Sequence, residues 1–166
     1  MRFAFLFMLP SLICPASAAA QGNPNDFGRA GPGTERQIYF AQVRKQVNDM
    51  LIRWQHAWER DDASELARLY AEGASYLPPA SSPVLTRGSI RDYFANFLGT
   101  VGDMQVRMMD FGTSGDLAYA TGRVSYQLQT RPGEHKQLVR TDLLVLRRRP
   151  NGEWQIQTHL AREDPE

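Results

Sequence analysis

Two side chains in the last third of the chain, Asp142 and His159, have the chemistry needed for proton transfer. Asp142 lies in the apolar run LVRTDLLVL, and a carboxyl group in partly apolar surroundings can stay protonated. In that form it donates a hydrogen bond to a developing oxyanion. The alternative is an ionised Asp142 that accepts hydrogen bonds from a neighbouring strand or pairs with an arginine such as Arg123 or Arg140. His159 suits the role of acid or base near neutral pH.

The position of His159 within its strand decides whether it can work with Asp142. His159 follows Trp154 by five residues, so strict alternation places it on the face opposite Trp154 and Ile156. A bulge in the strand would reverse that assignment. The other two histidines carry less weight, because His56 falls on the polar side of a helical stripe and His135 falls in a predicted hairpin turn.

Four aromatic side chains have the composition of a pocket wall for a small, largely apolar molecule. Trp54 and Trp58 lie one helical turn apart, and Tyr76 and Tyr126 lie in predicted strands. Aromatic residues at such positions also fill ordinary hydrophobic cores. Both interpretations stay open from the sequence.

The first half of the chain predicts three helices. Apolar residues recur at helical intervals after Thr34, which is spaced from Gln37 like the cap of a capping box. That helix should stop near Asp61, and Asp62 should cap a second, shorter helix that carries Leu66, Leu69 and Tyr70. A strand from Ala74 to Leu77 follows, which the two prolines after it must end. After a loop, Ser89 should cap a third helix.

The second half predicts an antiparallel sheet. Glycine-containing turns divide it into four strands, at about 104–112, 117–130, 137–149 and 153–162. The Asn151-Gly152 turn is the strongest hairpin signal among them. Helices followed by a meander of strands define an α+β fold in one domain, residues 34–166.

The N-terminus has the pattern of a secretory signal peptide. Residues 1–20 carry one charge, Arg2, an apolar core and small residues before Gln21. Residues 21–33, rich in glycine and proline, predict a flexible leader. The protein is therefore expected in the periplasm or secreted, and no later segment predicts membrane insertion of the mature form.

Composition excludes several classes of function. The only cysteine, Cys14, lies within the predicted signal peptide, so the mature chain has no thiolate nucleophile or cysteine-ligated zinc. The chain has 19 basic and 18 acidic residues, and without Arg2 the two numbers are equal. Such a neutral chain lacks the basic field of a nucleic-acid-binding protein. The sequence contains no metal-binding or phosphate-binding motif, so it does not indicate a metal ion or a cofactor.

Packing and turn residues follow one another along the chain in a characteristic order and spacing. They are Asp61-Asp62, Leu66, Leu69, Tyr70, Ala74, Arg87-Gly88, Ile90, Gly115-Asp116-Leu117-Ala118, Asn151-Gly152, Trp154 and Ile156. In this order the chain resembles the SnoaL-like family, whose relatives include the ketosteroid isomerases, over nearly the whole mature chain from about residue 43. The resemblance implies the cone-shaped nuclear transport factor 2-like fold, in which a curved, mostly antiparallel sheet wraps the helices and leaves an apolar conical pocket.

The resemblance does not extend to the catalytic residues of the ketosteroid isomerases. Pro78 stands where those enzymes have their aspartate base, and Trp54 stands where they have an oxyanion-hole tyrosine. Asp142 matches their third position. An indole donates one hydrogen bond but does not transfer a proton as a phenol does. Steroid isomerisation is therefore not expected.

Together these observations predict an exported domain that binds a small apolar molecule. If it is an enzyme, the resemblance implies isomerase, dehydratase or cyclase chemistry by proton transfer, with Asp142 as oxyanion donor and His159 as acid or base. The alternative is a non-catalytic binding or dimerisation module, because many relatives of this fold form homodimers through the sheet.

Overall fold

The computed structural model describes residues 33–164. The predicted signal peptide, residues 21–32 of the predicted leader and residues 165–166 lie outside this range. Within it, no helix combines the length and the hydropathy needed to cross a membrane.

Three helices precede most of a six-stranded sheet, as predicted. In the sheet the strands lie in the order β2-β1-β6-β5-β4-β3, and all neighbours are antiparallel except β1 and β6, which are parallel. The elements are α1 (Thr34–Glu59), α2 (Ala63–Arg68), β1 (Tyr70–Leu77), β2 (Val84–Leu85), α3 (Arg87–Ala95), β3 (Val101–Ser114), β4 (Leu117–Arg131), β5 (Glu134–Arg148) and β6 (Trp154–Glu163).

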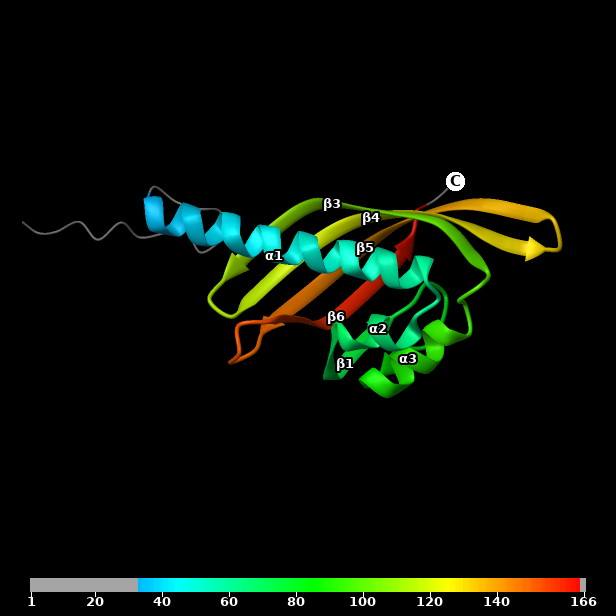
Figure 1. Cartoon of the computed structure of the whole chain (residues 1–166), viewed down its shortest axis with the longest axis horizontal. Coiled ribbons are helices and arrows are strands. Elements are labelled where there is room, and N and C mark those ends of the chain that lie inside the picture. Colours follow the sequence, from blue (N-terminus) through cyan, green and yellow to red (C-terminus); the bar gives the residue numbers. More distant parts are fainter. Residues whose placement is uncertain (1–32, 165–166) are drawn as a thin grey trace, which may run out of the picture.

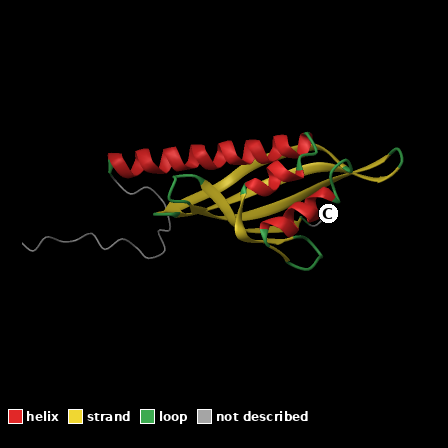
Figure 2. Ribbon diagram, turned by 60° about the horizontal axis from the view of Figure 1, so that its bottom comes forward, coloured by secondary structure: helices red, strands yellow, loops and turns green. Residues whose placement is uncertain are grey.

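The helices cover one face of the sheet. Helix α1 lies across the long strands, whereas α2 and α3 lie at the end of the sheet where β1 is found (Figure 1). Figure 2 shows the same layers from a second direction, with α1 along one side of the curved sheet. The hydrophobic core fills the space between them, and the predicted α+β architecture is confirmed.

One stripe of α1 is buried at helical intervals, as predicted. Its residues pack against the sheet, which stabilises the helix more than its own propensity does. The helix begins at Thr34 itself and Gly33 occupies the cap position without a side-chain hydrogen bond, so the predicted Thr34 cap is wrong. The buried stripe consists of Val43, Val47, Met50, Leu51, Trp54 and Trp58.

The caps of the two shorter helices differ in how well the sequence predicts them. The Asp62 carboxylate accepts a hydrogen bond from the Glu65 backbone N–H at 2.8 Å, which confirms that cap. Helix α3 begins earlier than predicted, because the Thr86 hydroxyl accepts from the Ser89 backbone N–H at 3.4 Å. Ser89 is thus inside the helix and is not its cap.

The first strand is longer than predicted. It begins at Tyr70 and not at Ala74, because Tyr70 pairs with Ile156 of β6, a parallel neighbour far along the chain. Tyr70 therefore belongs to a strand and not to the second helix. The strand ends at Leu77, before the two prolines, as predicted. The predicted loop after them contains the short strand β2.

A bulge in β6 determines which residues of that strand face the core. Val145 of β5 pairs with Thr158 and the next residue, Leu146, pairs with Ile156, so Gln157 has no partner in the ladder. One extra residue reverses the alternation of side chains beyond it. His159 is consequently buried on the same side as Ile156, and the expectation from strict alternation is wrong.

Insertion of one alanine between Thr158 and His159 should destabilise the domain. The inserted residue takes the inward position opposite Leu144, so His159 turns to the outer face and leaves its buried partners, at a cost of about 3–5 kcal/mol. Urea denaturation followed by circular dichroism measures this cost. The control is deletion of Gln157, which makes the ladder regular, keeps His159 inward and loses the side-chain hydrogen bond to Gly73 O. Similar stability of both variants would contradict the role of strand register in placing His159.

Candidate functional site

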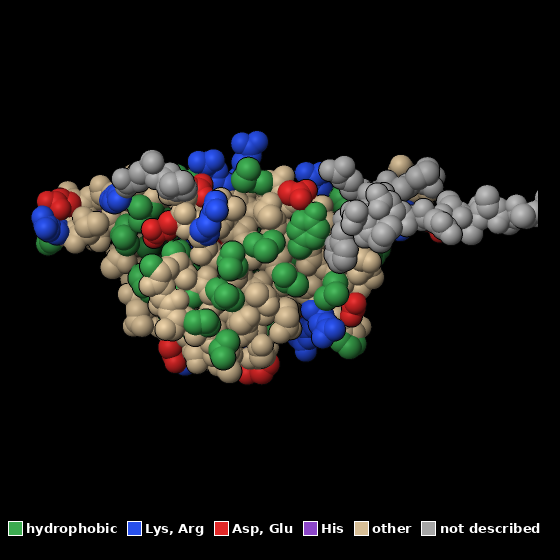
Figure 3. All heavy atoms as spheres, turned by 180° about the vertical axis from the view of Figure 1, so that it is seen from behind, with side chains coloured by type: hydrophobic (Ala, Val, Ile, Leu, Met, Phe, Trp, Pro, Cys, Tyr) green, Lys and Arg blue, Asp and Glu red, His purple; other side chains and the backbone are tan. Residues whose placement is uncertain are grey.

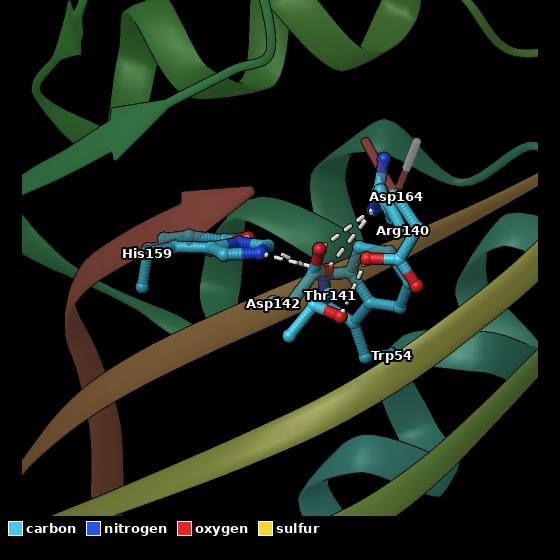
Figure 4. Close-up of polar contacts among 7 residues, drawn as sticks. Trp54, Arg140, Thr141, Asp142, His159 and Asp164 are labelled. Carbon is cyan, nitrogen blue, oxygen red and sulfur yellow. Dashed lines mark hydrogen bonds and ion pairs between the residues drawn. The ribbon is translucent and has the colours of Figure 1, made fainter. Parts of the chain in front are cut away.

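A chain of buried polar side chains connects α1 to three strands of the sheet. The Trp54 Nε1 group donates to the Tyr70 hydroxyl at 3.3 Å, and this hydroxyl lies 2.7 Å from His159 Nδ1. His159 Nε2 lies 3.0 Å from Asp142 Oδ2. Arg140 Nε lies 3.3 Å from the same oxygen and 3.0 Å from Asp142 Oδ1. Figure 4 shows His159 and Arg140 on opposite sides of Asp142.

The register of β5 and β6 places the predicted proton-transfer pair together. Asp142 pairs with Ala161 and Leu144 pairs with His159, so Asp142 and His159 are diagonal neighbours on one face of the sheet. Only 4% of Asp142 and 2% of His159 is exposed. The structure thus brings together the two residues that the sequence singled out, and it buries both.

Asp142 is held as a carboxylate. Burial alone would raise its pKa, but the charge of Arg140 and the contact with His159 outweigh burial and lower the pKa below its usual value. Burial likewise opposes the charge of Arg140, and the neighbouring carboxylate overcomes this effect and raises the pKa of Arg140. The expectation that Asp142 stays protonated as an oxyanion donor is therefore wrong. The alternative, an ion pair with Arg140, is confirmed.

The partners of His159 fix the hydrogen on one of its ring nitrogens. The carboxylate of Asp142 only accepts hydrogen bonds, so His159 Nε2 carries a hydrogen and donates to it. Indole only donates, so the Tyr70 oxygen accepts from Trp54. Between Tyr70 and His159 Nδ1 either atom can be the donor. The network thus has a fixed donor at Trp54 and a fixed acceptor at Asp142.

The inner cavity is the small enclosed space that Trp54, Asp142 and His159 line between α1 and the sheet. Its volume is about 10 Å³. A single water molecule needs roughly 10–15 Å³, so the cavity has no room for an organic ligand. Asp142 and His159 therefore share one cavity, but they are shut off from any larger molecule in this structure.

The outer pocket is a separate hollow of about 270 Å³ that contains three of the four predicted ligand-binding residues, Trp58, Tyr76 and Tyr126. Trp54 is excluded from it and belongs to the inner cavity. Arg140 connects the two spaces, because it lines the outer pocket and also contacts Asp142. Further aromatic residues of α3 and the loop after it complete the wall, namely Tyr93, Phe94 and Phe97.

Rings pack around the guanidinium group of Arg140. Its Cζ atom lies 5.9 Å from the ring centroid of Trp54 and 5.4 Å from that of Tyr126. Both distances are within the range of cation–π attraction. Burial raises the pKa of Tyr76 and keeps its phenol neutral beside the pocket. The Tyr76 ring also packs against His159, with 4.7 Å between the ring centroids.

The sequence did not identify Tyr70 as a member of the site, and it named Arg140 only as one possible partner. A signal for Arg140 was present, because residues two apart in a strand face the same side and Arg140 precedes Asp142 by two. No local signal pointed to Tyr70. Its contact with His159 depends on the parallel pairing of β1 and β6, which joins residues 89 apart in the chain.

A larger hollow than the outer pocket does not contain the predicted chemistry. It is an open groove of about 850 Å³ beside the β5–β6 turn, lined by charged side chains. Two of its arginines pair with carboxylates, Arg68 with Glu65 at 2.8 Å and Arg87 with Glu72 at 2.9 Å. Such exposed pairs are typical of a solvated surface. Residues 33–164 contain no cluster of three or more histidine or acidic side chains placed to hold a metal ion.

Comparisons with known proteins agree with this architecture. A ketosteroid isomerase-like protein from Erwinia carotovora atroseptica matches with a TM-score of 0.65 at 17% identity, over 74% of this chain and 96% of the other. A nuclear transport factor 2-like protein with a cystatin-like fold from Novosphingobium aromaticivorans matches with a TM-score of 0.65 at 15% identity, over 78% and 86%. A conserved protein from Planctomyces limnophilus matches with a TM-score of 0.65 at 16% identity, over 76% of this chain and 99% of the other. No curated protein matches.

The fold is therefore the cone-shaped nuclear transport factor 2-like fold, as predicted. A family model for the SnoaL-like domain matches residues 51–155, which is more than half of the chain. The chain belongs to the SnoaL-like family. The helix, strand and turn residues that carried the resemblance mostly lie within this match, and they account for the scaffold more than for any reaction.

Replacement of Asp142 by asparagine should destabilise the protein in a pH-dependent way. The variant leaves Arg140 charged and buried without its carboxylate, which costs about 3–5 kcal/mol near pH 7. Because folding lowers the pKa of Asp142, its contribution is complete above the unfolded value of 3.8 and is lost as the pH falls through the folded value. The stability difference between wild type and variant should therefore shrink between pH 5 and pH 3.

Urea denaturation at pH 7, 5 and 3 measures this difference. The control is Asp49→Asn, which removes a carboxylate of the exposed pair with Lys45 and should cost less than about 1 kcal/mol. A deficit of Asp142→Asn that stays constant over the whole pH range would contradict the ionised carboxylate.

Proposed function

We propose that this protein binds a small, largely apolar molecule in the outer pocket. The observation that carries the proposal is the pocket itself, about 270 Å³ in volume and walled by aromatic rings from α1, β1, α3 and β4. Pockets for drug-sized ligands span roughly 300–1000 Å³, so this one suits a molecule of one or two rings. Flat rings stack or meet edge to face with aromatic walls.

Binding accounts for the site better than proton transfer does. Proton transfer by His159 needs a ring nitrogen within hydrogen-bond distance of the substrate, directly or through one water. Both nitrogens of His159 are occupied, one by Tyr70 and the other by Asp142. In the proposed function, Asp142 and His159 therefore position Arg140 and Tyr70 behind the pocket wall. Isomerase, dehydratase or cyclase chemistry is the rival, and it requires the inner cavity to open.

A planar neutral probe, 2-naphthol, should bind to the outer pocket and raise the melting temperature. A ligand that binds only the folded state at about 100 times its Kd adds about 2.7 kcal/mol, which corresponds to several degrees for a domain of this size. Leu138→Trp fills the pocket from β5 and should abolish the shift. The measurement is a thermal-shift titration with tryptophan fluorescence as a second readout.

The control variant is Met109→Trp, which makes a similar enlargement at a position that is 60% exposed on β3. It should leave the shift unchanged. An equal shift in Leu138→Trp and wild type would show that 2-naphthol binds elsewhere, and the absence of any shift in wild type would count against the binding function.

A second candidate, a dimerisation module, has its own support on the outer face of the sheet. The ladders place Leu143 opposite Leu160, and Leu160 opposite Leu77, so apolar side chains cross three adjacent strands. Leu143 is 37% exposed and Leu160 is 41% exposed. Figure 3 shows hydrophobic side chains across the middle of the face opposite α1, with most charged groups nearer its edges. Contiguous apolar surface of this kind is typical of an association site.

The paired substitution Leu143→Glu and Leu160→Glu should convert a dimer into a monomer, because it places like charges at the centre of a two-fold interface. Size-exclusion chromatography with light scattering gives the mass. The control is Ile38→Glu on α1. Ile38 is 60% exposed, and this variant should not change the mass. A wild-type protein that is monomeric at high micromolar concentration removes this candidate.

A further inference from the structure

Two buried hydrogen-bond donors at the outer pocket have no partner. Arg140 Nη2 and Trp58 Nε1 are enclosed and make no hydrogen bond to any described residue. Arg140 is 6% exposed and Trp58 is 5% exposed, and both line the outer pocket. A buried donor without an acceptor costs free energy, about 1–3 kcal/mol for a neutral group and more for a charged one. Both side chains line the outer pocket, but the two donor atoms have no exposed surface in this structure, so a ligand pairs with them only after the side chains shift toward it.

The internal partner of Arg140 explains why its outer nitrogens stay free. Arg140 Nε lies 3.0 and 3.3 Å from the two oxygens of Asp142. The guanidinium group has five N–H donors in one plane, four of them on the two Nη atoms. Nη2 has no partner among the described residues, and Asp142 Oδ1 accepts no hydrogen bond either. The ion pair thus holds the guanidinium in place and leaves Nη2 unpaired.

The remaining polar groups of the pocket also favour an acceptor. The hydroxyls of Tyr76, Tyr93 and Tyr126 make no hydrogen bond within residues 33–164, and burial raises the pKa of Tyr76 and of Tyr93. Tyr76 and Tyr93 therefore keep their hydrogens and can donate. Glu163, which accepts, is an exposed residue of the pocket lining. A pocket rich in donors selects an acceptor-only group, and a carboxylate has two oxygens that match the arginine fork.

We infer that the outer pocket takes an aromatic monocarboxylate, with its carboxylate held by Arg140 and Trp58 and its ring held among the surrounding aromatic side chains. This inference rests on the proposed binding function and adds the chemical class of the ligand. The ring lies among the aromatic side chains, and the acid group lies at Arg140, which lines the outer pocket and also contacts Asp142 of the inner cavity. Carboxylate oxygens there satisfy donors that the protein leaves unpaired.

The test compares two molecules of the same shape, 2-naphthoate and 2-naphthamide, by isothermal titration calorimetry at pH 7. The amide carries two N–H donors where the acid has an acceptor, and it has no charge. Naphthoate should bind at least about tenfold more tightly, since hydrogen bonds between charged groups are stronger than neutral ones.

Two variants separate the contributions of the donors. Trp58→Phe keeps a six-membered aromatic ring and removes the pyrrole ring with its N–H, so it should weaken naphthoate binding several-fold more than naphthamide binding. The double variant Arg140→Met with Asp142→Leu removes the buried charges together, an exchange that often preserves stability. It should lose the preference for naphthoate while it still binds the amide. The matched control, Arg147→Gln with Asp116→Asn, removes an exposed pair at 3.9 Å and should keep the preference.

Each outcome has a separate meaning. Equal affinity of wild type for the two molecules, or a preference that survives in the double variant, overturns the carboxylate inference and leaves the binding function intact. Unchanged naphthoate affinity in Trp58→Phe overturns the part assigned to Trp58. If wild type binds neither molecule and 2-naphthol fails as well, both the inference and the binding function are wrong.

Discussion

The carboxylate of Asp142, buried between the helices and the sheet, is the constraint on which the rest of the site depends. An isolated charge in a protein interior costs several kcal/mol, so it must have partners there. Arg140 comes from the same strand, and His159 comes from the next strand through a bulge that turns its ring inward. The position of Tyr70 follows from His159, and that of Trp54 follows from Tyr70. The ionised carboxylate of Asp142 thereby fixes the positions of side chains from four elements, α1, β1, β5 and β6.

This network also divides the interior into two spaces with different properties. On one side the inner cavity is nearly filled, so its polar side chains form hydrogen bonds with one another and not with a ligand. On the other side the aromatic side chains leave the outer pocket open, and Arg140 is one of the residues that line it. Tight packing holds the polar chain in place, and the looser packing beyond it leaves room for a ligand. The packed side chains of the inner cavity thus hold the residues that line the outer pocket in position.

The sequence predicted the scaffold well because its signals are local. Helical spacing in α1, the Asp62 cap and the glycine turns each depend on a few consecutive residues, and the SnoaL-like resemblance rests on such positions. Asp142 and His159 were identified by residue type, but their roles were not. The ionised state of Asp142 depends on Arg140, and the orientation of His159 depends on a bulge at Gln157 that has no composition signal. These features arise from pairing between strands.

The indole at the start of the hydrogen-bonded chain has a consequence for proton conduction. A proton wire works only if every member can exchange its donor and acceptor roles, so that the chain can reset after each transfer. Trp54 donates and never accepts, which fixes the polarity of the chain at that end. A phenol at this position would both donate and accept. With an indole, the chain ends at Trp54, and no proton passes through it to α1; any exchange is confined to Tyr70, His159 and Asp142.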